Sequence, residues 1–409
     1  MTHHTDLAAA GAGVSEALNR IRRRLPQPVM SLTTLVMVTM GSVGFVVLTA
    51  AAAGSEPIVA APLQQGAGTT RVYYIAADEV DWDYAPSAVN QITGQPFGET
   101  ENVFVERGAN RIGKVYRKSL YREYTDGTFR TPKAPDARWQ HLGMLGPIIH
   151  AEVGDTIEVR FKNNTRFPAS IHPHGVRYAK DAEGTPYNDG TSGPAKADDA
   201  VAPGGTFTYR WSVPERAGPG PHDGSSVVWM YHGHIDEVAD TNAGLVGALV
   251  VTRRGSARSD GSPADVDREF VIYMSVVDEN ATPYLDHNIQ TFTGRPPTVK
   301  TDDEEFVESN LMHAINGFVY GNLPGLEMRS GQRVRWYVIS LGTEVDLHGP
   351  HWHGQTGLFM GIRTDMIELM PGSMKVLDMV PDEPGIWLMH CHTNDHILAG
   401  MQALFRVAQ

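Results

Sequence analysis

The chain has 409 residues, a length that fits two or three domains rather than one. Its formal net charge of −13 argues against a nucleic-acid-binding protein, which needs a basic face, so we expect no nucleic-acid partner. A single cysteine excludes an intramolecular disulfide, a four-cysteine zinc site and a cysteine-ligated iron–sulfur cluster, whereas seventeen histidines supply many imidazoles.

The N-terminal segment has the pattern of an export signal or a membrane anchor. Residues 1–30 contain a basic cluster at 20–24. The apolar run that follows at 31–53 is long enough to span a bilayer with the N-terminus in the cytoplasm. Small residues at 50–54 also suit cleavage, after which 54–68 is a linker. A cleaved signal and an uncleaved anchor both stay open, whereas a buried core helix is disfavoured. In both cases we expect an extracytoplasmic protein, secreted or anchored to the cytoplasmic membrane.

Beyond residue 68, apolar and polar residues alternate with the period of β-strands. Strands are predicted at residues 156–162, 206–213, 247–252, 270–277, 333–340, 374–380 and 403–407. Many short strands separated by Gly and Pro turns are typical of β-sandwiches, so the predicted fold class is all-β. A polar linker at 255–267 divides the chain into domain 1 (69–254) and domain 2 (268–409).

Each domain carries the same two His-x-His motifs, so the domains are repeats of each other. The aligned motifs are His172/His174 with His351/His353, and His232/His234 with His390/His392. Residues two apart on a strand point to the same face, so each motif presents two imidazoles together, as a metal site requires. Four such pairs in register argue against scattered structural histidines.

Cys391 lies between His390 and His392, so on a strand its sulfur points away from both imidazoles and belongs to a different metal site. His348 and His396 add two imidazoles to the Cys391 thiolate, and Met401 adds a weak axial thioether. Together these are the ligand set of a blue-copper electron-transfer centre. The aligned positions of domain 1 are Ala169, Gly233, Val238 and Leu245, none of which can ligate copper. The eight remaining motif histidines suffice for three more coppers, and four coppers can hold the four electrons that reduce dioxygen to water.

With these residues, the sequence resembles the multicopper oxidases, and in particular the ceruloplasmin–hephaestin branch, over roughly residues 140–409. The motifs that carry the resemblance are His141-Leu-Gly-Met-Leu-Gly-Pro147, His172-Pro-His-Gly-Val-Arg-Tyr178, Asp189-Gly-Thr-Ser-Gly193, Tyr231-His-Gly-His-Ile-Asp236, Glu304-Glu-Phe-Val-Glu-Ser-Asn310, His313-Ala-Ile-Asn-Gly317 and Trp387-Leu-Met-His-Cys-His392. The resemblance implies two Greek-key cupredoxin β-sandwiches and an oxidase that couples one-electron oxidation of a substrate to reduction of O2.

The resemblance also implies a role for each ligand. Type 1 copper is assigned His348, Cys391, His396 and Met401; type 2 copper His172 and His351; the type 3 pair His174, His232, His234, His353, His390 and His392. Electrons would pass from Cys391 to its neighbours His390 and His392. Animal relatives of this branch have six domains, whereas this chain resembles the two-domain oxidases with type 1 copper only in the second domain. Those assemble as homotrimers, with each trinuclear cluster between one chain's first domain and a neighbour's second.

The reducing substrate implied by the resemblance is Fe(II), because Glu308, His313 and Asp395 match the iron site of ceruloplasmin-type ferroxidases. An alternative role for Asp395 is a proton relay to the trinuclear cluster. A laccase-like oxidase of phenols or aromatic amines stays an alternative function. A copper nitrite reductase would carry its cysteine-ligated site in the first domain, and a non-catalytic binding protein would lack most copper ligands, so both are disfavoured.

Asp198 and Asp199 resemble the calcium loop of related domains. Two adjacent carboxylates are also common in plain turns, so calcium and an ordinary turn both remain interpretations of this pair.

Overall fold

The computed structural model describes residues 68–134 and 136–409. The predicted signal or anchor at 31–53 lies outside the described residues. Within the described ranges, no helix is long and apolar enough to cross a bilayer.

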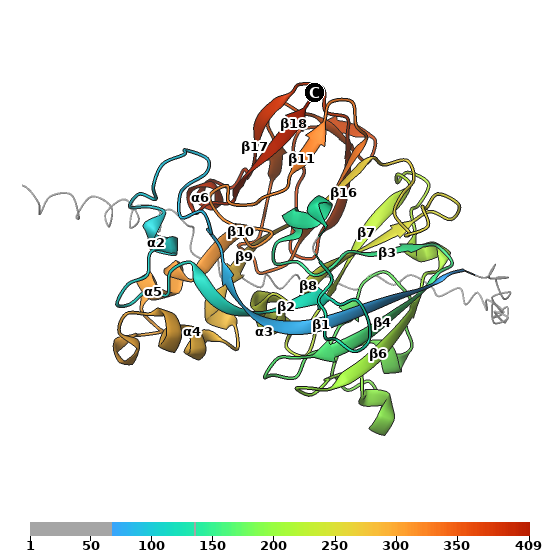
Figure 1. Cartoon of the computed structure of the whole chain (residues 1–409), viewed down its shortest axis with the longest axis horizontal. Helices are drawn as coiled ribbons and strands as arrows, with labels where there is room; N and C mark the ends of the chain where they lie inside the picture. Colours follow the sequence, from blue (N-terminus) through green and yellow to red (C-terminus); the bar gives the residue numbers. More distant parts are fainter. Residues whose placement is uncertain (1–67, 135) are drawn as a thin grey trace, which may run out of the picture. The chain divides into compact units, whose positions relative to one another are not determined.

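The first half of the described chain is a sandwich of two four-stranded sheets, with strand orders β2-β1-β4-β6 and β3-β8-β7-β5 (Figure 1). The strands are β1 (Thr70–Asp83), β2 (Val115–Glu123), β3 (Ile149–Glu152), β4 (Thr156–Asn163), β5 (His172–Pro173), β6 (Thr206–Ser212), β7 (Ser226–His232) and β8 (Val246–Thr252). Alternate residues of the facing strands, such as Val159, Trp211 and Leu249, are fully buried in one apolar core between the sheets.

The second half repeats this arrangement with sheets of order β10-β9-β12-β16-β14-β15 and β11-β18-β17-β13. The strands are β9 (Arg268–Asp278), β10 (Leu311–Ile315), β11 (Glu327–Arg329), β12 (Val334–Ser340), β13 (Pro350–Trp352), β14 (Gly357–Phe359), β15 (Ile362–Thr364), β16 (Met374–Met379), β17 (Gly385–Cys391) and β18 (Gln402–Ala408). Trp336, Met389 and Phe405 lie in its core together with Cys391.

Strand pairing confirms that the halves share one topology. β1 runs parallel to β4 as β9 does to β12, and β7 pairs antiparallel with both β5 and β8 as β17 does with β13 and β18. All seven predicted strands are present, as β4, β6, β8, β9, β12, β16 and β18, with ends within two residues of those expected. The all-β prediction is therefore confirmed.

Short helices lie in the connections between the strands. They are α2 (Asn102–Val105), α3 (Glu237–Ala243), α4 (Leu285–Phe292), α5 (Glu304–Ser309) and α6 (Asn394–Leu398), with 3-10 turns at Ala137–Leu142, Lys180–Ala182, Gly193–Lys196, Glu215–Ala217, Glu279–Ala281 and Pro296–Thr298. Phe104 of α2 and Phe306 of α5 share a buried cluster with Met312 of β10, so a segment of the first half packs beside the second.

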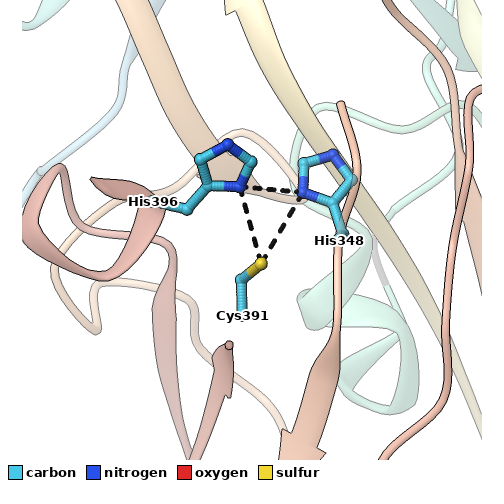
Figure 2. Close-up of side chains that lie close together, drawn as sticks. All are labelled: His348, Cys391 and His396. Carbon is cyan, nitrogen blue, oxygen red and sulfur yellow. Dashed lines mark hydrogen bonds between the residues drawn. The ribbon is translucent and has the colours of Figure 1, made fainter. Parts of the chain in front are cut away.

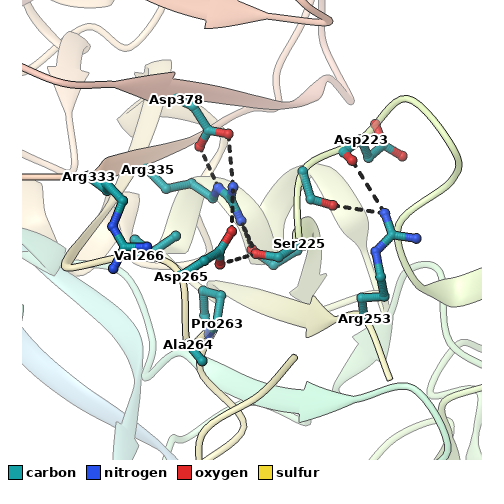
Figure 3. A network of polar contacts seen from close by, with 12 residues as sticks. Asp223, Ser225, Arg253, Pro263, Ala264, Asp265, Val266, Arg333, Arg335 and Asp378 are labelled. Carbon is teal, nitrogen blue, oxygen red and sulfur yellow. Dashed lines mark hydrogen bonds and ion pairs between the residues drawn. The ribbon is translucent and has the colours of Figure 1, made fainter. Parts of the chain in front are cut away.

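The two sandwiches meet through an apolar layer and a polar network. Val228 and Val250 of the first sandwich share a buried cluster with Val271 and Ile339 of the second. At the edge of this layer, the guanidinium of Arg335 donates to both carboxylate oxygens of Asp378, at 2.5 and 2.8 Å, and to the hydroxyls of Ser225 and Ser226 at 2.7 and 2.8 Å (Figure 3). The Ser225 hydroxyl donates in turn to Asp265, so hydrogen bonds connect the segment 255–267 between the sandwiches to both of them.

Candidate copper centres

A buried thiol and two imidazoles converge at the end of β17. Cys391 Sγ lies 3.5 Å from His396 Nδ1 and 3.8 Å from His348 Nδ1, and the two nitrogens are 3.2 Å apart (Figure 2). Strand β17 supplies the cysteine, α6 supplies His396 five residues later, and the loop between β12 and β13 supplies His348. These three donor atoms are close enough to bind one metal ion together.

The local environment favours the thiolate form of Cys391. Burial raises the pKa of the thiol, but hydrogen bonds with His348, His396 and the backbone N–H groups of Thr393 and Gly349 bring that pKa down to about 5. Met401 is fully buried in the same core, and its carbonyl accepts a hydrogen bond from the Cys391 N–H at 3.1 Å. The four predicted type 1 ligands are thus neighbours in the structure.

The four motif histidines of the first half form a second group. Strand register places His172 opposite His232, and the Nε2 atoms of His174 and His232 are 3.0 Å apart. His234 completes the group, with its ring centroid 4.9 Å from that of His172. Burial, followed by repulsion from neighbouring imidazoles, lowers the pKa of His174 to about 4, so this ring is neutral and able to ligate at pH 7.

The four motif histidines of the second half form an equivalent group. The register His351↔His390 matches the first half, and His353 Nε2 again lies 3.0 Å from His390 Nε2. His351 Nδ1 is 3.4 Å from His390 Nε2, and the ring of His392 stacks on His351 at 4.9 Å. The donor atoms of His351, His390 and His392 are close enough to share one ion.

Backbone contacts fix the ring orientations in both groups. His232 Nδ1 donates to the Gly233 carbonyl at 2.9 Å, and His390 Nδ1 donates to the Cys391 carbonyl at 2.8 Å. His172 Nδ1 likewise donates to the Glu183 carbonyl at 2.7 Å. An imidazole whose protonated Nδ1 donates to a carbonyl keeps the lone pair of its Nε2 free to bind a metal. Imidazole nitrogens presented in this way are suitable ligands for copper.

The glycine after each His-x-His motif has a steric reason. Gly175 and Gly354 have φ values of +76° and +67°, and a Cβ atom on either would collide with the indole of Trp229 or Trp387 at 2.2 or 2.3 Å. The close indole packs under the turn that carries the histidines in both halves.

The two histidine groups do not touch each other. Within residues 68–134 and 136–409, no hydrogen bond or ring contact joins a motif histidine of the first half to one of the second. The strand pattern predicted the membership of each group, and the structure shows that the two groups are separate within one chain.

The residues of the predicted iron site gather beside His396. The ring centroid of His313 lies 5.1 Å from that of His396, and the rings of Phe104 and His313 form a T-shaped pair with centroids 5.8 Å apart. Desolvation, followed by the charge of Asp395, raises the pKa of Glu308. Both carboxylates are exposed, whereas His313 and His396 are buried.

The predicted calcium residues have different partners. Asp198 is buried, and its Oδ2 accepts from the Gly184 N–H at 2.9 Å while its buried Oδ1 has no partner within the described chain. Asp199 pairs with the ammonium of Lys196 at 3.0 Å, and that ammonium also lies 3.2 Å from Asp189. A lysine therefore already neutralises part of this loop, and calcium here stays a prediction.

Three carboxylates contact motif histidines without having been singled out from the sequence. Asp346 lies 3.2 Å from His348 Nε2, Asp365 lies 3.4 Å from His351 Nε2, and Glu237 lies 3.4 Å from His234 Nε2. The donor atoms of His232, His234 and Glu237 are also close enough to share an ion. Their proximity in sequence to the motifs was the only available signal, and it is a weak one for acidic residues.

Comparison with known proteins agrees with this geometry. Two family models, both described as multicopper oxidase, match residues 140–256 and 291–409. Human hephaestin is 45% identical over 344 residues, and rat ceruloplasmin is 46% identical over 343 residues; each match covers 83% of this chain. The chain spans only 29% of hephaestin and 32% of ceruloplasmin.

Solved structures give the same fold. A multicopper oxidase matches with a TM-score of 0.51 at 18% identity, covering 83% of this chain and 89% of that one. The copper nitrite reductase of Nitrosomonas europaea matches equally well, with a TM-score of 0.51 at 16% identity, covering 83% of this chain and 95% of that one. At these identities the matches show the cupredoxin-like fold alone, which confirms the predicted fold class. The two family models, which together cover more than half of the chain, show that it belongs to the multicopper oxidase family.

Proposed function

We propose that this protein is a copper-dependent oxidase that couples one-electron oxidation of Fe(II) to four-electron reduction of O2 to water. The observation that carries the proposal is the position of Cys391, which converges with His348 and His396 and is bonded on both sides to members of the second histidine group, His390 and His392. A mononuclear thiolate site and a multinuclear imidazole site are therefore joined by single peptide linkages.

Residues of the chain itself hold the Cys391 thiol in place and shield it from water. The backbone N–H groups of Gly349 and Thr393 each donate to Cys391 Sγ at 3.4 Å, and full burial of the thiol excludes water from it. We assign His348, His396 and Met401 to type 1 copper with Cys391. The other eight motif histidines, as assigned above, are proposed to hold the type 2 and type 3 coppers. When bound, four coppers supply the electrons that O2 needs.

The substrate proposal depends on Glu308, His313 and Asp395. Exposed carboxylates beside a buried imidazole suit a cation that arrives from solvent, and oxygen and imidazole donors suit iron. The ring of His313 is 5.1 Å from His396, whose Nδ1 is 3.5 Å from Cys391 Sγ. A cation held there would thus be close to the thiolate site through two imidazoles.

Replacing Glu308 with alanine is expected to lower kcat/KM for Fe(II) by at least about tenfold, the effect of losing about 1.4 kcal/mol of interaction. Turnover of a phenol should not change, because a phenol does not need this carboxylate. Steady-state kinetics with both substrates measures this, with Glu305→Ala on the exposed face of the same helix as a matched control. Fe(II) turnover that is no better than phenol turnover and is unaffected by Glu308→Ala would instead support the laccase-like alternative.

We further propose that the active unit is a homotrimer, in which the first-half histidines of one subunit meet the second-half histidines of the next. The support is that the two histidine groups do not contact each other within the described chain, and that exposed apolar side chains lie beside the second group. Met366, whose backbone pairs with His351, is 41% exposed, and Met370 is 62% exposed. A head-to-tail ring uses two different faces of each subunit and closes without unpaired ends.

Mixing two inactive variants tests this assembly. His174→Ala/His232→Ala disables the first-half group and His353→Ala/His390→Ala the second-half group, so each pure protein should be inactive. When equal amounts of the two variants are refolded together, roughly a quarter of the subunit junctions should combine an intact first-half group with an intact second-half group. Activity should therefore recover to about a quarter of the wild-type value. Light scattering should give three times the 44.7 kDa chain mass. A monomeric mass, or no recovery on mixing, contradicts the trimer.

A further inference from the structure

A buried carboxylate lies behind one of the imidazoles that converge on Cys391. Asp346 Oδ1 is 3.2 Å from His348 Nε2, and the two side chains are 1% and 0% exposed. Because a carboxylate oxygen accepts, Nε2 of His348 carries the proton, and the lone pair lies on Nδ1, the atom that faces the thiol at 3.8 Å.

Asp346 is itself held rigidly. Its Oδ1 accepts from the Val276 N–H of β9 at 2.7 Å, and its Oδ2 accepts from the Thr343 N–H at 2.9 Å. One contact comes from a core strand and the other from its own loop, so the carboxylate cannot turn away from the imidazole without losing buried hydrogen bonds.

The second imidazole of the site has a different environment. His396 also directs its Nδ1 at the thiol, at 3.5 Å, but within the described chain its ring makes no hydrogen bond to a carboxylate and instead packs against His313. One imidazole therefore faces the proposed substrate site, and the other faces a fixed negative charge.

The internal repeat allows the residue at the position of Asp346 to be compared between a half with a thiolate site and a half without one. Alignment of His172 with His351 places Ala169 opposite His348 and Phe167 opposite Asp346. The half without a thiolate site thus has an apolar residue where the half with one has the buried carboxylate, although the loop joins equivalent strands in both halves.

We propose that Asp346 is a positioning residue for type 1 copper: it fixes His348 in the tautomer that ligates through Nδ1, and its negative charge lowers the reduction potential of copper bound there. This inference depends on the proposed function, because it requires copper at Cys391. A carboxylate behind a metal-bound imidazole increases the basicity of the ligand and so favours the more highly charged metal ion.

The experiment is a redox titration of the thiolate-to-copper absorption band in Asp346→Asn, which removes the charge with little change in shape. We expect a blue protein with a raised reduction potential and a copper affinity lowered roughly 10–100-fold. Asp365→Asn is the matched control, because Asp365 contacts His351 rather than a type 1 ligand and should leave the potential of the band unchanged.

A second measurement covers the case in which the Asn variant does not fold. In cobalt-substituted wild-type protein, the Nε2 proton of His348 should appear as a shifted NMR resonance that exchanges slowly with solvent, and rapid exchange contradicts the hydrogen bond. A blue Asp346→Asn protein with an unchanged potential overturns this inference and leaves the proposed function intact. A colourless wild-type protein overturns the proposed function itself.

Discussion

Replacing Cys391 with serine will remove the intense visible absorption of the copper-loaded protein together with one copper per chain. The band arises from charge transfer between a thiolate and copper, and the structure offers one thiolate, fully buried between His348 and His396. Serine keeps the size of the side chain but is not a copper ligand at neutral pH. Metal analysis and absorption spectroscopy on wild type and variant measure both losses, and we expect four coppers to become three.

The Met401→Leu variant is the matched control for this experiment. A thioether is a weak ligand of such centres, so its loss should keep the band and the copper count while changing the reduction potential. Oxidation of every reducing substrate should cease in Cys391→Ser, because the same site serves Fe(II) and phenols. A colourless wild type with one metal per chain would contradict the copper assignment as a whole.

Replacing Lys118 with methionine will destabilise the protein by about 3–5 kcal/mol, the usual cost of removing one partner of a buried ion pair. Lys118 of β2 and Glu279 after β9 form an ion pair in which both side chains are fully buried, and Glu279 also accepts from the Tyr84 hydroxyl at 2.6 Å. Methionine would leave the Glu279 carboxylate between the two sandwiches without its cation. Denaturant unfolding followed by tryptophan fluorescence measures the loss.

The double variant Lys118→Met/Glu279→Leu distinguishes an unpaired charge from a packing defect. Removing both charges should restore most of the lost stability, because no buried carboxylate then remains uncompensated. Lys133→Met is the surface control: Lys133 pairs with Glu123 but is 59% exposed, so its loss should change stability by less than about 1 kcal/mol. Equal destabilisation of the single and double variants would contradict the electrostatic explanation.

The sequence predicted seven of the sandwich strands and the members of each histidine group because both depend on spacing. A period of two residues places His351 and His353 on one face whatever surrounds them, and the turn chemistry of Gly175 and Gly354 repeats with them. The long first strand, β1, was not predicted because its buried and exposed residues do not alternate. Near its middle, Ile75, Ala76 and Ala77 are buried in succession.

The carboxylates of the sites were harder to predict, because tertiary contacts select them among the many acidic residues of the chain. Asp346 is buried by β9, and nothing in its own loop distinguishes it from the exposed Glu344 nearby. Phe104, which covers His313, comes from a segment more than two hundred residues away. The spacing of residues along one strand carries no information about contacts between distant segments, so these contacts could be identified only from the structure.

The separation of the two histidine groups has a consequence for how the protein would keep its metal. If each trinuclear cluster needs two subunits, copper retention obeys mass action: dilution that dissociates the ring also opens the cluster, and bound copper in turn drives association. Loading and assembly would then be one equilibrium. A freshly made, isolated subunit would carry no competent oxygen-reducing centre until it met its neighbours.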